Sequence, residues 1–258
     1  GLDQAQNVFT LRNVPDLDRI MAHLTPETKT AVVIGAGFIG LEMAENLSKR
    51  GLAVTLIEKA PQVLPPLDIE MAAYVKNELI ASGVTVKTSA SALAFQAAGR
   101  EIVLDTGEVV TTDLTILSVG VQPETSLAQA AGLKLGIGGG ILVDDHYQTS
   151  APDVYAVGDA IVVKQQLTGQ DALIALASPA NRQGRQVADV LAGINRFNRG
   201  SIGSAIVRVF GLTAASTGLS EAQAKLANLP IAVVHITGKD HAAYYPGAKD
   251  LLLKLIFN

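Results

Sequence analysis

The residues with the clearest chemical signature form the segment GAGFIG at positions 35–40, whose glycines follow the spacing GxGxxG. Gly35 permits a tight turn, Gly37 lets the backbone approach a ligand closely, and Gly40 lets a helix lie against a strand. The N–H groups at the start of such a helix, together with its positive dipole end, favour a pyrophosphate. The segment therefore predicts a dinucleotide site, with an unliganded glycine-rich turn as the alternative.

Glu58 has the chemistry and the position to bind the sugar of that dinucleotide. It closes a predicted strand roughly 20 residues after the glycines, where an acidic side chain accepts hydrogen bonds from ribose hydroxyls. Because its charge would repel a 2′-phosphate, we expect NADH to be preferred to NADPH. The adjacent Lys59 would weaken this preference, so the predicted cofactor is NAD(H) or NADP(H).

Four further residues of this region are candidates for contact with the nucleotide. Ala36, Phe38 and Ile39 complete the glycine loop and are predicted to line the cofactor. Glu42 follows in the predicted helix, where two interpretations stay open. Its carboxylate either compensates the helix dipole, a contribution of roughly 0.3–1 kcal/mol, or lies near the nicotinamide and takes part in the chemistry.

The elements that must position these residues alternate between strands and helices. The pattern predicts strands at 30–35, 52–58 and 84–88 and helices at 38–51 and 69–83. The first helix places Ile39, Met43, Ala44 and Leu47 on one face. A βαβαβ order requires a parallel sheet with right-handed crossovers, so the fold class is α/β with a Rossmann-like domain.

The pattern changes after this unit. We expect a hairpin that turns at Thr106 and Gly107, followed by a closing strand that ends at Gly120. Further predicted elements are strands at 141–143 and 154–157, a helix at 171–192, a boundary at 195–204, strands at 205–211, 212–219, 230–237 and 251–257, and a helix at 220–228. The polar stretch 1–29 is interpreted as a connector with one short helix at 16–24.

Composition narrows the classes of function. Apolar residues make up 48% of the 258 residues and the net charge is −4, which favours a packed core and argues against a nucleic-acid partner. The absence of cysteine excludes a disulfide or a cysteine nucleophile within this sequence, and four scattered histidines predict no metal site. Without a long apolar run or a signal peptide, we expect no membrane span and a cytoplasmic location.

Three segments resemble a known family. GAGFIGLEMAENL at 35–47, TSAPDVYAVGDA at 149–160 and ALASPANRQGRQVADVLAG at 175–193 are similar to segments of the FAD-dependent pyridine nucleotide-disulfide oxidoreductases, in the same order. HAAYYPG at 241–247 resembles the segment that carries an active-site tyrosine in coenzyme A-disulfide reductases. The resemblance covers essentially the whole chain and favours the coenzyme A-disulfide or polysulfide reductase branch.

The resemblance implies cofactor contacts in the middle of the chain. Asp159 would hydrogen-bond the ribityl chain of FAD, Gly158 would allow its close approach, and Gly120 would contact cofactor. The helix expected to begin near Asp171 would direct its N-terminus at the flavin. Without the resemblance, the Gly-Asp pair would be interpreted as an ordinary turn.

The resemblance also implies contacts with nicotinamide and substrate. Phe38 matches a ring that occupies the nicotinamide pocket until the cofactor enters, although the residue alone suggests packing. Asn181 would lie near a coenzyme A substrate. Tyr244 would reach the active site of a partner subunit and donate to a reacting sulfur, whereas Tyr245 would be structural.

The implied architecture combines pieces of three domains. They are a connector at 1–29, an NAD(P)-binding Rossmann-like domain at 30–120, the C-terminal part of an FAD-binding domain at 121–197, and the start of an α+β dimerisation domain at 198–258. Since family members carry an earlier FAD-binding fingerprint and a cysteine, we expect this chain to be an inactive internal fragment of a homodimeric enzyme.

The implied reaction passes hydride from NAD(P)H through FAD to a cysteine-linked disulfide, with coenzyme A disulfide or polysulfide as the small-molecule substrate. Two alternatives stay open. One is an NADH oxidase or peroxidase of the same family, and the other is a non-catalytic NAD(H)-sensing module, which the absence of cysteine favours.

Overall fold

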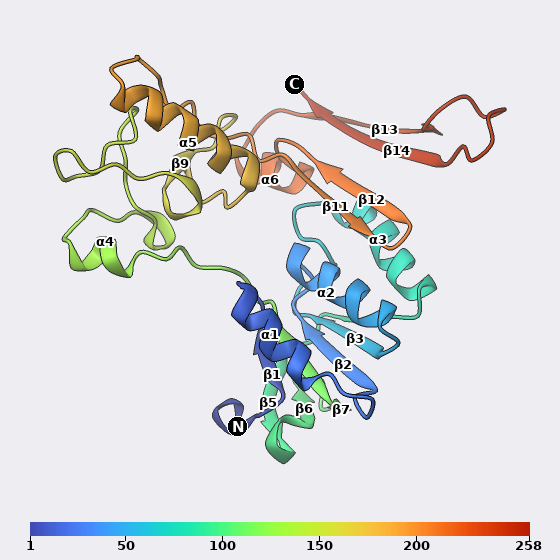
Figure 1. Ribbon diagram of the computed structural model, residues 1–258. Coiled ribbons are helices and arrows are strands. Elements are labelled where there is room, and N and C mark those ends of the chain that lie inside the picture. Colours follow the sequence, from blue (N-terminus) through green and yellow to red (C-terminus); the bar gives the residue numbers. More distant parts are fainter. The chain divides into compact units, whose positions relative to one another are not determined.

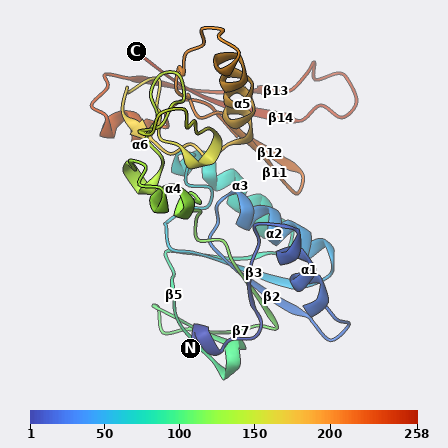
Figure 2. The same ribbon diagram turned by 60° about the vertical axis from the view of Figure 1, so that its left-hand side comes forward.

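The computed structural model describes residues 1–258 and contains two compact units. The first unit comprises 1–121 and 206–215, and the second comprises 122–205 and 216–258. Figure 1 labels most of their elements, and Figure 2 shows the same chain after a turn of 60°.

The first unit is built on a five-stranded parallel sheet with the order β1-β8-β2-β3-β4. Its strands are β1 (Val8–Thr10), β2 (Thr30–Ile34), β3 (Ala53–Glu58), β4 (Thr85–Thr88) and β8 (Leu114–Leu117). The crossover helices are α2 (Phe38–Lys49) and α3 (Ile69–Ala81), and α1 (Val14–His23) follows β1. The predicted βαβαβ order and parallel sheet are confirmed.

Both faces of this sheet are covered, which explains why its strands are continuous apolar runs. On one face, Ala31 and Val33 of β2 share a buried cluster with residues of the three helices. On the other face, Val32 and Ile34 pack against a three-stranded antiparallel sheet. That sheet consists of β5 (Ala92–Gln96), β6 (Glu101–Leu104) and β7 (Val109–Thr111), and it includes the predicted hairpin.

One predicted helical contact is wrong. Met43, Ala44 and Leu47 are buried in α2 as expected, but the side chain of Ile39 is 38% exposed. Leu41 is fully buried in its place. Gly40 lies against the backbone of Gly35, directly after β2. The face of the helix directed at the sheet therefore runs through positions 40, 44 and 47, and Ile39 lies to one side of it.

A hairpin distant in sequence completes the helical side of the first unit. Val207 and Val209 of β11 (Ala205–Val209) join the helix-side core, and β12 (Leu212–Ser216) pairs with β11. At the turn, the Glu45 carboxylate accepts a hydrogen bond of 2.8 Å from the Phe210 N–H. Burial raises the pKa of Glu45, but its bonds with Lys49 and Phe210 outweigh this and hold the pKa below its usual value.

The second unit contains shorter elements. They are α4 (Ser126–Ala130), β9 (Val163–Lys164), β10 (Asp171–Ala172), α5 (Ala177–Leu191), α6 (Glu221–Leu226), β13 (Ala232–Lys239) and β14 (Asp250–Phe257). Four 3₁₀ turns complete the chain, at Leu2–Gln4, Ala97–Gly99, Ile137–Gly139 and Gly158–Ala160. A small core around Tyr147, Ile161 and Val163 holds the part before α5 together. No helix in the structure is long and apolar enough to span a bilayer.

Two predictions for the second unit are wrong. Positions 141–143 and 154–157 form isolated bridges, such as Ile141 with Ile161, instead of strands. The helix predicted from Asp171 begins at Ala177, because Asp171 pairs in β10 with Lys164 of β9 and forms an ion pair with it. The predicted strands and helix after residue 205 are confirmed as β11, β12, α6, β13 and β14.

A carboxylate in the first unit yields a test of stability against pH. Oδ2 of Asp113 accepts hydrogen bonds from the N–H groups of Lys29 and Thr30, both at 3.0 Å, and from the Thr30 hydroxyl at 2.9 Å. The Lys29 N–H contributes most, and with Thr30 and Arg100 it outweighs the effect of burial and lowers the pKa of Asp113 below its ordinary value of 3.8. This stabilisation is present above pH 3.8 and is lost as the pH falls through the folded-state pKa.

We expect Asp113→Asn to lower the free energy of unfolding by about 1 kcal/mol at neutral pH, since three bonds to a charged acceptor weaken. The difference from the unmodified chain should vanish at acidic pH, below the folded-state pKa. Asp18→Asn, at an exposed position, is the control. Denaturant titrations from pH 2 to 7 measure both, and a difference that does not decrease as the pH falls below 3.8 would contradict the assignment.

Candidate functional site

Two of the three loop glycines are required by the fold itself. Gly35 has φ of +102°, and a Cβ built there would lie 2.4 Å from the Ser118 carbonyl oxygen. A Cβ on Gly40 would lie 1.9 Å from the Gly35 carbonyl oxygen. Side chains at these positions would therefore collide with backbone, and both glycines are explained without a ligand.

Gly37 is different from its neighbours. Its φ of −78° and ψ of −172° suit any residue, and no atom lies within 4 Å of a Cβ built there. Neither packing nor backbone conformation requires a glycine at this position. The open space beside Gly37 is what a closely approaching ligand needs.

The start of α2 is free to meet an anion. Gly37 is the N-cap residue, so no side chain caps the helix, and the first turn contains no acidic residue. The first N–H groups of a helix lack partners within the helix, and they carry its positive partial charge. A helix start with this character next to open space suits a phosphate.

Glu58 is held firmly at the edge of the glycine loop. Its two carboxylate oxygens accept hydrogen bonds from the Ala36 N–H at 2.6 Å and the Ala60 N–H at 2.7 Å. Each oxygen keeps a further lone pair for a hydroxyl donor. The side chain of Lys59 is exposed beside it. Ala36 is fully buried and its carbonyl accepts from the Leu64 N–H, so this residue positions the loop.

The other candidates of the first unit occupy different environments. Phe38 is half-buried and packs against the helix-side core, whereas Ile39 and Glu42 are exposed. Glu42 lies beyond the first turn of α2, where dipole compensation has weakened. Gly120 adopts φ of +118° after β8 and has no atom within 4 Å of a built Cβ.

Ser118 is a residue that the sequence analysis missed. Its hydroxyl contacts the carbonyl oxygens of Ile34 at 3.0 Å and Gly35 at 2.8 Å. It therefore ties the end of β8 to the glycine loop. The signal available in the sequence was its position directly after a buried strand, since ligands bind beyond the carboxyl ends of parallel strands.

The Gly-Asp pair lies in the second unit. Gly158 adopts φ of +82° and its N–H donates to Oε1 of Gln183 at 2.7 Å. Gln183 is only 2% exposed and comes from α5, so a buried amide fixes the turn. Asp159 is exposed beside it, and no hydrogen bond within the chain occupies its carboxylate. No local pattern in the sequence marks Gln183 as a contact of this turn.

The implied substrate residues also lie in the second unit. Asn181 is exposed on α5, four positions after its start. Tyr244 is 84% exposed in the loop between β13 and β14, and Tyr245 is 59% exposed. The two rings lie 5.1 Å apart, and the loop is closed where the Asp240 N–H donates to the Lys249 carbonyl at 3.0 Å.

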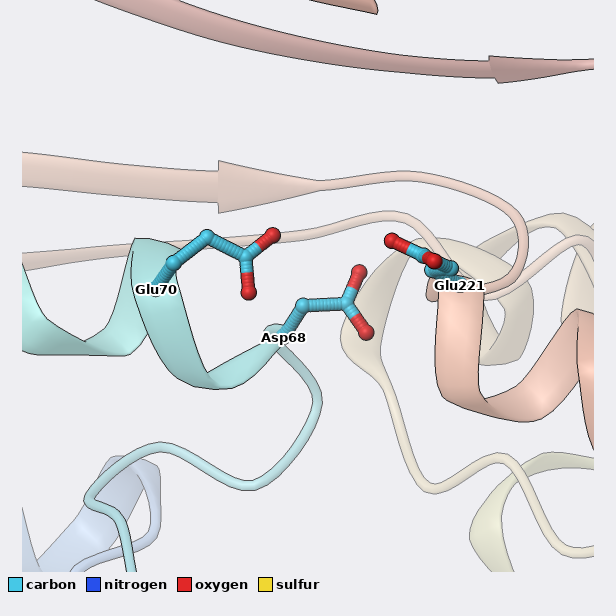
Figure 3. A group of neighbouring side chains, drawn as sticks. All are labelled: Asp68, Glu70 and Glu221. Atoms are coloured by element: carbon cyan, nitrogen blue, oxygen red, sulfur yellow. The ribbon is translucent and has the colours of Figure 1, made fainter. Parts of the chain in front are cut away.

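Three carboxylates lie at the starts of helices, and this position accounts for their acidic character without a metal ion. Asp68 and Glu70 belong to the start of α3 in the first unit, and Glu221 belongs to the start of α6 in the second (Figure 3). Hydrogen bonds from Lys225 and then Lys254 lower the pKa of Glu221. Because acidic residues are favoured at helix N-termini, we assign no metal centre to these side chains.

Comparison with known proteins agrees with this arrangement. The family described as pyridine nucleotide-disulphide oxidoreductase matches residues 1–184. An NADH oxidase of Methanocaldococcus jannaschii is 36% identical over 97% of this chain and 56% of its own length. A coenzyme A disulfide reductase of Staphylococcus aureus is 32% identical over 97% of the chain and 57% of its own length.

Among solved structures, that of reduced Bacillus anthracis CoADR-RHD is 48% identical, with a TM-score of 0.98, and it is matched over 100% of this chain and 46% of its own. The chain thus spans about half the length of the proteins it matches. The fold and the motif order agree with the family resemblance of the sequence. The chain belongs to the pyridine nucleotide-disulphide oxidoreductase family.

Proposed function

We propose that the first unit binds NADH across the carboxyl ends of β2 and β3. The observation that carries this proposal is Gly37, which the fold does not require and which leaves space beside an uncapped helix start. The pyrophosphate lies against the N-terminus of α2, and Glu58 accepts hydrogen bonds from the adenosine ribose. Phe38, Ile39 and Gly120 line the nucleotide, and Glu42 lies near the nicotinamide.

The second unit supplies part of a flavin site in this proposal. The turn at Gly158 is fixed by Gln183, and the free carboxylate of Asp159 fits a hydroxylated chain such as the ribityl group of FAD. When bound, FAD supplies the means to pass electrons from NADH to a disulfide. The residues of this chain bind and orient the two cofactors.

The disulfide would be a small molecule such as coenzyme A disulfide or a polysulfide. Asn181 contacts the coenzyme A substrate, and the hydroxyl of Tyr244 donates a proton to the departing thiolate in a partner subunit of a homodimer. The exposure of Tyr244 supports a role outside its own unit. Because this chain contains no cysteine, the thiol that exchanges with the disulfide belongs to residues outside the 258.

Two other functions have an observation in their favour. The 36% identity to an NADH oxidase favours a family member that passes electrons to oxygen or peroxide. The absence of cysteine favours a non-catalytic module that senses NAD(H). The loop HAAYYPG favours the disulfide reductase, since neither alternative has a use for an exposed tyrosine hydroxyl.

We expect Gly37→Val to weaken NADH binding at least roughly tenfold, because the new side chain occupies the space that the pyrophosphate requires. Binding is measured by titration of the fluorescence of NADH. The melting temperature should change little, since nothing in the chain meets a Cβ at this position. Ala81→Val, on the exposed end of α3, is the matched control, and Gly40→Ala should instead reduce stability by about 1–3 kcal/mol. Identical NADH titrations for the Gly37→Val and Ala81→Val variants would remove the assignment.

A pair of neighbouring variants tests the cofactor preference. Glu58→Gln keeps one of the two acceptor oxygens that bind the Ala36 and Ala60 N–H groups and removes the charge, so the ratio of the dissociation constants for NADPH and NADH should fall at least about fivefold. Lys59→Met should raise the same ratio. Titration of each variant with both nucleotides gives the ratios. If neither substitution changes the ratio, Glu58 does not discriminate at the ribose.

Tyr244→Phe tests the proton donor in the longer protein that contains this chain. With NADH and coenzyme A disulfide, kcat should fall about 10²-fold, a typical loss for a general acid. Tyr245→Phe is the matched control and should retain activity. NADH-dependent oxygen consumption at the full rate without any disulfide would instead favour the oxidase.

A further inference from the structure

A cavity of about 340 Å³ lies within the second unit, between α5 and the loop that follows this helix. Its volume is in the range of small-molecule sites. None of its lining residues belongs to the nucleotide or substrate candidates described above. The lining residues are Gln166, Arg182, Gln186, Asn195, Arg196, Phe197 and Arg199.

The cavity is positively charged in a chain whose net charge is −4. Three guanidinium groups line it and no carboxylate does. Arg196 is neutralised by Asp189, with Nε and Oδ2 2.7 Å apart. Arg182 donates only to the carbonyl of Gly200, at 2.7 Å, and the side chain of Arg199 has no hydrogen bond or ion pair. Two positive charges therefore remain for an anion.

The loop that carries Arg196 and Arg199 is held in place by several hydrogen bonds, and Arg182 lies on α5. Nε2 of Gln166 donates to the Arg199 carbonyl at 2.9 Å, and Nδ1 of His146 lies 2.8 Å from the Arg196 carbonyl oxygen. The Asn198 N–H donates to the Asp145 carbonyl at 2.7 Å. The guanidinium groups thus project from a fixed backbone, which lowers the entropy cost of binding.

The rest of the lining suits a heterocyclic ring. The side chain of Phe197 is 49% exposed, and its ring centroid lies 4.9 Å from that of His146. Oε1 of Gln186 accepts from the Tyr147 hydroxyl at 2.5 Å, which leaves its NH₂ group to donate. The NH₂ group of Gln166 is engaged, which leaves its oxygen to accept. The cavity thus offers a nucleobase an aromatic face for stacking, a hydrogen-bond donor and a hydrogen-bond acceptor.

We infer that this cavity binds a nucleoside monophosphate. The phosphate lies between Arg182 and Arg199, because guanidinium groups bind phosphate oxygens in pairs. The base lies against Phe197 and exchanges hydrogen bonds with Gln166 and Gln186. This site goes beyond the proposed binding of NADH at the glycine loop and does not depend on it.

The test is calorimetric titration of the chain with AMP in the Gly37→Val background, so that AMP has no access to the glycine loop. We expect AMP to bind, and Arg199→Met to weaken it roughly tenfold or more, since a charge-assisted contact is lost. Arg182→Met should act in the same direction. Arg185→Met, on the same helix but outside the cavity lining, is the matched control and should leave the affinity unchanged.

Two smaller probes, which lack the base, test how much the base contributes to the affinity. Ribose 5-phosphate and inorganic phosphate should bind more weakly than AMP, and Phe197→Ala should remove the advantage of AMP. Equal affinity for phosphate and AMP, or AMP binding that survives both arginine substitutions, would overturn the inference. Arg199→Met keeps the test valid if Arg182→Met fails to fold, because the Arg199 side chain is exposed and forms no hydrogen bond or ion pair within the chain. A failure of NADH binding in the unmodified chain would leave this result unaffected.

Discussion

In the first unit, α2 packs closely against the end of β2, and the candidate site depends on this contact. A Cβ on Gly40 would lie 1.9 Å from the carbonyl oxygen of Gly35, so backbone packs directly on backbone. This contact fixes the start of the helix beyond the carboxyl edge of the sheet. The uncapped N–H groups of α2, the space beside Gly37 and the carboxylate of Glu58 are then close to one another in the chain's fold.

In the proposed nucleotide site, Glu58 would connect the stability of the loop with its specificity. Both oxygens of its carboxylate accept backbone N–H groups, from Ala36 on the glycine loop and from Ala60 after β3. The side chain therefore has a structural role before any ribose binds, and its orientation is fixed in advance. A preorganised acceptor loses little entropy on binding, which fits the proposed role of this carboxylate as an acceptor for ribose hydroxyls.

The sequence predicted the elements whose apolar residues repeat with the spacing of a helix or a strand. It did not reveal the elements and contacts that form only through residues distant in sequence. The apolar run 30–35 and the glycine spacing were sufficient for the parallel sheet and the loop. The segment Val8–Thr10 is too short to show an alternation of apolar and polar residues. It forms strand β1 only because β8 supplies its hydrogen bonds. Ser118 and Gln183 act on backbone 83 and 25 residues away, respectively, and no local pattern reveals such contacts. The helix is predicted to include Asp171 because the strand in which Asp171 pairs with Lys164 is only two residues long, too short to show an alternating pattern.

The hairpin of β13 and β14 supports the assembly in which Tyr244 would act. Along its paired strands, one face consists of apolar side chains that are each at least 41% exposed: Val234, Ile236, Leu251, Leu253, Leu255 and Phe257. Exposed apolar surfaces of this extent mark sites of protein contact. The loop with Tyr244 joins the same two strands, so in the proposed dimer we expect the subunit that covers this face to lie near the tyrosine. A second subunit in that position would bury the exposed apolar face. It would also bring the hydroxyl of Tyr244 to the active site in which it is proposed to act as a proton donor.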